Sequence, residues 1–171
     1  MRFKYFIAFV ILTTFCCISV AAQDSVQKFE IVEDKEQLKA MVPASFYFAG
    51  LSGGTQMRNS AVGKLGEKRF IVSGLVDVSG YSTEISGVYE GFFITDSPIN
   101  FGNKTLDIGA YGIGFAKKGE VNIFDLSGKK ILVTETTKDE EMRRPRPLMM
   151  IPDKMGIKLY KGRDFVLISP R

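Results

Sequence analysis

The sequence predicts an all-β fold: a single antiparallel β-sandwich or closed β-barrel of about 8–10 short strands, with one short N-terminal helix. From residue 44 onward, short hydrophobic segments alternate with stretches rich in Gly, Asn, Asp or Pro, which is typical of strands joined by turns. Strands do not alternate with long helical segments, and this argues against a parallel sheet.

The helix is predicted over residues 35–41, because Glu33 and Asp34 precede this segment and Pro43 follows it. Segments such as FGNKT, LSGKK and PDKMG carry the turn residues expected between the strands of hairpins. Strands are predicted within nine segments: 45–50, 69–78, 87–95, 110–116, 120–126, 129–135, 147–151, 156–160 and 164–169.

Residues 1–22 are expected to be a signal peptide. Arg2 and Lys4 form a basic start, residues 6–20 are apolar, and small residues at 20–22 suit cleavage. The apolar run is short for a membrane-spanning helix, so we expect no stable membrane insertion after cleavage. The chain then divides into the signal (1–22), an N-terminal segment with the helix (23–43) and one β domain (44–171). We expect a bacterial protein exported to the periplasm or secreted.

Cleavage changes the composition that bears on function. It leaves 149 residues with 21 basic and 19 acidic side chains, a net charge of +2. This near balance gives no electrostatic reason to expect nucleic-acid binding. Both cysteines, Cys16 and Cys17, lie in the signal, so the mature chain cannot form disulfides and must be held by its core. A chain of this length can bury enough surface for one domain.

Glycines alternate with large side chains in the segment AYGIGFA. In a strand, Tyr111 lies on one face with Ile113 and Phe115, whereas Gly112 and Gly114 lie on the other. One interpretation is a strongly curved sheet. The other is a smooth groove floor for a flat ligand or an extended peptide. The binding residues predicted by the second interpretation are Tyr81, Tyr89, Tyr111, Gly112 and Gly114.

Residues 104–115, KTLDIGAYGIGF, resemble the L-x-x-G-x-Y hairpins of transthyretin-like and carboxypeptidase-regulatory-like β-sandwich domains. The proline that usually follows the leucine in those hairpins is absent here. The resemblance implies a β-sandwich and a hairpin over these residues, and it implies no function.

Two catalytic patterns in the sequence are expected to be coincidental. Residues 50–54, GLSGG, match the nucleophile elbow of serine hydrolases, but the chain contains no histidine to activate Ser52. Three glycines in five residues instead predict a turn. The S-x-x-K pattern at 127–130 lacks the companion motifs of penicillin-recognising enzymes, and it is predicted to be a hairpin tip.

No metal or cofactor is predicted. Without His, and without Cys after cleavage, the usual zinc and other transition-metal sites have no ligands. Asp96, Asn100 and Asn103 do not form a calcium-loop pattern, and the adjacent Met149 and Met150 would point to opposite faces of a strand. No pair of carboxylates stands out as catalytic, so a hydrolase that works without histidine or metal is a lesser alternative.

The most unusual composition is TTKDEEMRRPRPLMM, residues 136–150. Acidic residues 139–141 precede Arg143, Arg144 and Arg146. One interpretation is a self-neutralised surface loop. The other is an arginine fork that binds a carboxylate or phosphate.

We therefore predict an exported, non-catalytic β-domain that binds an unknown small molecule or a cell-envelope protein. The polar segment 77–87 would be an exposed recognition loop beside the glycine face. The alternative is a structural or assembly protein that pairs through strand edges.

Overall fold

The computed structural model describes residues 28–116 and 118–171. The predicted signal peptide, residues 1–22, lies outside them. Within the described ranges, no helix is long and apolar enough to cross a membrane.

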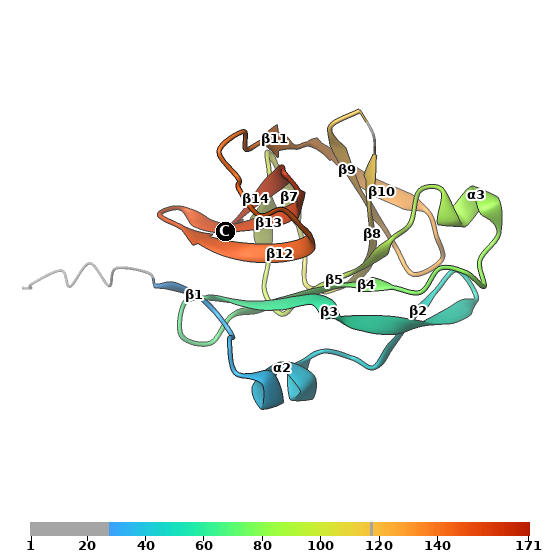
Figure 1. Cartoon of the computed structure of the whole chain (residues 1–171), viewed down its shortest axis with the longest axis horizontal. Helices are drawn as coiled ribbons and strands as arrows, with labels where there is room; N and C mark the ends of the chain where they lie inside the picture. The colour runs from blue at the N-terminus through green and yellow to red at the C-terminus, as the bar shows by residue number, and fades with distance from the viewer. Residues whose placement is uncertain (1–27, 117) are drawn as a thin grey trace, which may run out of the picture.

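Two antiparallel sheets make up most of the fold (Figure 1). The eight-stranded sheet has the order β1-β3-β4-β5-β8-β9-β10, with β2 also paired to β3. Its strands are β1 (Phe29–Ile31), β2 (Ser45–Phe48), β3 (Leu51–Leu65), β4 (Phe70–Val76), β5 (Gly91–Thr95), β8 (Gly109–Ala116), β9 (Glu120–Phe124) and β10 (Lys130–Glu135).

The six-stranded sheet has the order β12-β13-β14-β6-β7, with β11 paired to β14. It contains β6 (Ile99–Phe101), β7 (Lys104–Leu106), β11 (Thr137–Lys138), β12 (Arg146–Asp153), β13 (Gly156–Gly162) and β14 (Asp164–Pro170). Figure 1 shows its strands β12 to β14 lying over one end of the long strand β3.

These sheets confirm the predicted antiparallel all-β class and correct three details. Neither sheet closes on itself, so the closed-barrel alternative is wrong. The described residues form 14 strands, more than predicted, partly because β6, β7 and β11 are only two or three residues long. The segment 104–115 is not a hairpin, because β7 belongs to the six-stranded sheet and β8 to the eight-stranded sheet.

Strand β3 also departs from the prediction, and at 15 residues it is the longest of the described strands. Its glycine-rich start was predicted to be a turn. The turn lies just before it, at Ala49 (φ 47°) and Gly50 (φ 88°), and both have the left-handed backbone that a two-residue hairpin requires. Ser52 is therefore a strand residue paired with Tyr47 of β2, and the geometry of a nucleophile elbow is absent.

The main core fills the space between the two sheets. Phe93 of β5 and Phe101 of β6 meet edge to face across it, with ring centroids 5.1 Å apart. Fully burying each such side chain contributes about 1.5–3 kcal/mol. Members of this core from both sheets include Leu65, Ile71, Phe93, Ile113, Ile123, Phe101, Leu159, Val166 and Ile168.

A second hydrophobic cluster covers the outer face of the eight-stranded sheet. The covering elements are helix α2 (Lys35–Met41), strand β2 and the segment around the short helix α3 (Thr83–Ser86). Helix α2 begins after Asp34, whose Oδ1 accepts a hydrogen bond of 2.7 Å from the Gln37 N–H. Figure 1 shows α2 on the side of β3 opposite to β12.

Candidate functional site

The glycine face of β8 is covered by other residues of the chain. A Cβ added at Gly112 would overlap the ring of Phe48, lying 2.8 Å from its Cδ2. A Cβ added at Gly114 would overlap the carbonyl oxygen of Val88 and lie 2.8 Å from its carbonyl carbon. Both glycines therefore allow neighbouring parts of the same chain to approach the sheet closely.

The structure brings two of the predicted tyrosines into the layer over this face. Phe48 stacks on Tyr89 with ring centroids 3.9 Å apart, and Tyr81 meets Tyr89 edge to face at 5.4 Å. The Tyr81 hydroxyl donates to the Leu51 carbonyl at 3.0 Å. The Tyr89 hydroxyl is buried, and this burial, followed by the electrostatic interaction and hydrogen bond with Tyr81, raises the pKa of Tyr89.

The remaining predicted tyrosine lies elsewhere. Tyr111 packs against the core between the sheets, and its hydroxyl donates to the Asp107 carbonyl at 3.0 Å. Burial, followed by the nearby Asp107 carboxylate, raises the pKa of Tyr111. Tyr111 thus faces away from Gly112. Binding at the glycine face stays a prediction, and a ligand there would have to displace Phe48.

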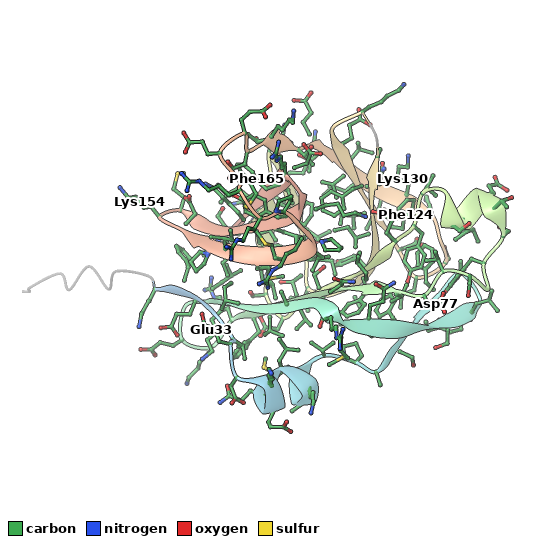
Figure 2. All side chains as sticks on the ribbon, viewed as in Figure 1. Glu33, Asp77, Phe124, Lys130, Lys154 and Phe165 are labelled. Atoms are coloured by element: carbon green, nitrogen blue, oxygen red, sulfur yellow. The ribbon has the colours of Figure 1, made fainter. Side chains whose placement is uncertain are left out.

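An open groove of about 400 Å³ lies between β3 and β12, beside the N-terminal segment. Its wall on β3 contains Arg58, Ser60 and Ala61, and its wall on β12 contains Arg146 and residues 148–152. The segment 31–33 and the side chain of Leu38 close a third side. Figure 2 shows Glu33 between β1 and α2, where it contributes a carboxylate to this side.

The groove occurs where the edge of β3 lacks a neighbouring strand. β2 pairs with residues 51–54 of β3, and β1 pairs with residues 63–65. Pairing of β3 with β4 also shifts register between Thr55 and Ser60, just where Arg58 projects. β12 has a similar shift between Arg146 and Met149. Such irregularities redirect side chains and commonly occur beside binding sites.

Two arginines in the groove have side chains without a partner among the described residues. Arg58 and Arg146 are exposed, and neither guanidinium forms an ion pair or hydrogen bond with any described residue. A guanidinium carries five N–H donors and no acceptor. All of these donors are therefore available to a ligand. Glu33, which also lines the groove, is exposed as well.

Only one of the three predicted arginines belongs to this site. Arg146 lines the groove, whereas Arg143 and Arg144 are exposed on the preceding loop and do not line it. Arg58 is the second arginine that lines the groove. It was missed because its segment was not predicted to be a strand. No local signal marks Arg58, since its relation to Arg146 exists only after the sheets have packed.

The acidic residues that precede these arginines in the sequence form their contacts with other parts of the chain. Asp139 accepts a hydrogen bond of 2.9 Å from the Tyr160 hydroxyl, and its N–H donates to the Arg163 carbonyl at 2.9 Å. Glu140 pairs with Lys138 at 2.8 Å. The Lys138 side chain, through its hydrogen bond and then its charge, lowers the pKa of Glu140. The loop is thus anchored without ion pairs to Arg143, Arg144 or Arg146.

The Tyr160–Asp139 contact predicts a loss of stability at alkaline pH. Burial, followed by the hydrogen bond to Asp139 and the charge of its carboxylate, raises the pKa of Tyr160 from 10.0 to about 12. Because the folded-state pKa lies above the unfolded value, the contribution of Tyr160 to the free energy of unfolding is complete below pH 10.0. It is lost as the pH rises through about 12. Urea unfolding of Tyr160→Phe should show a smaller alkaline decline and about 1–2 kcal/mol less stability at pH 7. A decline identical to that of the unmodified protein would contradict the assignment.

Among the residues that the structure describes, no group of three or more His, Cys, Asp or Glu side chains is placed to hold a metal ion.

The described part of the molecule is a two-sheet, all-β protein with a groove at the edge of its longest strand. No protein-family model, curated protein or solved structure matches this chain.

Proposed function

We propose that this protein is an exported, non-catalytic β-domain that binds a ligand in the cell envelope, and that the groove between β3 and β12 is its binding site. The observation that carries this proposal is that Arg58 and Arg146, whose guanidiniums have no partner among residues 28–116 and 118–171, line one groove of about 400 Å³. Small-molecule sites usually have volumes of about 300–1,000 Å³ and combine apolar lining with a few polar groups. Export rests on the basic and apolar character of residues 1–22.

The groove lining supports binding over catalysis. The Ser60 hydroxyl donates to the Met57 carbonyl at 2.8 Å, and no histidine exists in the chain to activate it. Glu33 is the carboxylate in the described lining, whereas glycoside hydrolysis normally uses two. A hydrolase based on carboxylates therefore stays the lesser alternative.

The sheet edges weigh against assembly by strand pairing. β1 and β7 are three residues long, which offers little edge to another chain. β12 contains Pro147 and Pro152, neither of which has an N–H to donate. β10 shifts register between Lys130 and Leu132. Size-exclusion chromatography at micromolar concentration tests this alternative, and a stable oligomer would favour it.

Native mass spectrometry of the exported protein, purified gently, tests the proposed function. We expect the mass of residues 23–171, together with a small bound mass that denaturation releases. Ile151→Arg should abolish the bound mass, because Ile151 lines the groove. The matched control is Ile131→Arg, which places the same change on β10, at a side chain that is 46% exposed. A bound mass that persists in Ile151→Arg would place the site elsewhere.

A further inference from the structure

We infer that the groove binds a singly charged, single-chain anionic amphiphile, whose carboxylate head contacts Arg58 and Arg146 and whose apolar chain lies along β12. This inference rests on the proposed function and specifies the class of its ligand. Three observations support it: the charged side chains of the groove, its apolar side chains, and the prolines in the backbone of β12.

The charge of the groove favours an anionic head. Arg58 projects from β3 and Arg146 from the start of β12, so the two guanidiniums belong to different walls. A guanidinium can donate two parallel hydrogen bonds to a carboxylate or a phosphate. Neither arginine forms an ion pair within the described part of the chain that binding would have to break. Glu33 offsets one of the two positive charges, and this favours a head with a single negative charge.

The rest of the lining favours an apolar chain. Ile31 and Leu38 lie on the side of the N-terminal segment, and Leu148 and Ile151 lie on β12. Ile31, Leu38 and Ile151 are only partly buried, so a bound alkyl chain would remove apolar surface of these side chains from water. Met149 also lines the groove, and flexible methionine side chains adapt readily to an irregular chain.

The backbone of β12 disfavours an extended peptide as the occupant. A peptide that adds to a sheet edge is held mainly by main-chain hydrogen bonds. Pro147 and Pro152 remove two N–H donors from this strand. An alkyl chain needs none of these hydrogen bonds, so the prolines do not oppose its binding.

The test is a proton–nitrogen NMR titration of residues 23–171 with decanoate, below its micelle concentration. We expect saturable shifts at the amides of residues 58–61 and 148–151. Arg58→Gln and Arg146→Gln should each weaken decanoate binding about 10-fold, because each removes charge-assisted hydrogen bonds to the head. Arg143→Gln and Arg144→Gln are the matched controls and should leave the affinity unchanged. Decyl phosphate, whose head carries about 1.5 to 2 negative charges at pH 7, tests the preference for a single charge and should bind no more tightly than decanoate.

Three results would overturn the inference. Equal binding of the neutral decyl maltoside, unaffected by the Arg58 and Arg146 variants, would show that the head is not recognised, although the groove would still bind ligands. Equal shifts with acetate would show that the apolar chain contributes nothing. If no probe shifted the groove amides while the mass spectrum still showed a bound mass that depends on Ile151, this inference would fail and the proposed function would stand.

Discussion

Gly114→Ala is expected to lower the free energy of unfolding by about 3 kcal/mol or more, or to prevent folding. The added Cβ would overlap the carbonyl oxygen of Val88, which is a backbone atom and not a movable side-chain end. The chain around Val88 cannot retreat easily. The N–H groups of Val88 and Tyr89 donate to the Ile85 carbonyl at 3.0 and 2.9 Å, and the Glu90 N–H donates to Ile113 at 2.9 Å.

The matched control for this prediction is Gly54→Ala. Gly54 is an exposed glycine in β3, and a Cβ added there has nothing within 4 Å. Its effect should stay within about 0.5 kcal/mol. Urea unfolding followed by circular dichroism measures both variants. Equal stability of the two proteins would mean that the segment 88–90 does not lie against β8 as described.

Phe48→Ala is expected to cost about 3–5 kcal/mol, because it leaves a cavity in the cluster over the outer face of the large sheet. Phe48 is 2% exposed, stacks on Tyr89 and meets Phe124 edge to face at 5.9 Å. Tyr47→Ala is the control from the same strand, since the Tyr47 side chain is 58% exposed. It should change the free energy of unfolding by no more than about 0.5 kcal/mol.

A double-mutant cycle shows whether Phe48 occupies the space above Gly112. Gly112→Ala alone should destabilise the protein, because its Cβ would meet the Phe48 ring. In the Phe48→Ala background the same change should cost much less, giving a coupling free energy of about 1 kcal/mol or more. Additive effects would contradict the packing, and they would restore the idea of an open groove floor at this glycine.

Nine segments were correctly predicted to contain strands, because period-two hydrophobic patterning is a local property of the chain. In β8, Ile113 does belong to the core between the sheets while Gly112 faces Phe48 on the other side, as the alternation predicts. Between β6 and β7, the segment FGNKT does form a turn, with Gly102 at φ 60°.

β3 was missed for a physical reason. Its first part combines Gly53 and Gly54 with polar residues, and five of the side chains from Leu51 to Arg58 are exposed. Nothing local distinguishes such a segment from a loop. It is a strand because β2, β4 and β1 pair with it, and these are contacts between parts of the chain that the sequence pattern does not connect.

The candidate site likewise contains one arginine that the sequence could indicate and one that it could not. Arg146 could be singled out from the sequence, because it lies in an unusual run of arginines and prolines. Arg58 could not, since its role depends on the gap between β1 and β2 along β3 and on the packing of β12 against that gap. The sequence by itself determined nine strand-forming segments and the absence of histidine, because hydrophobic patterning and composition can be read locally. Only the tertiary structure decided which faces are covered and which arginines line the same groove, because long-range packing places those residues.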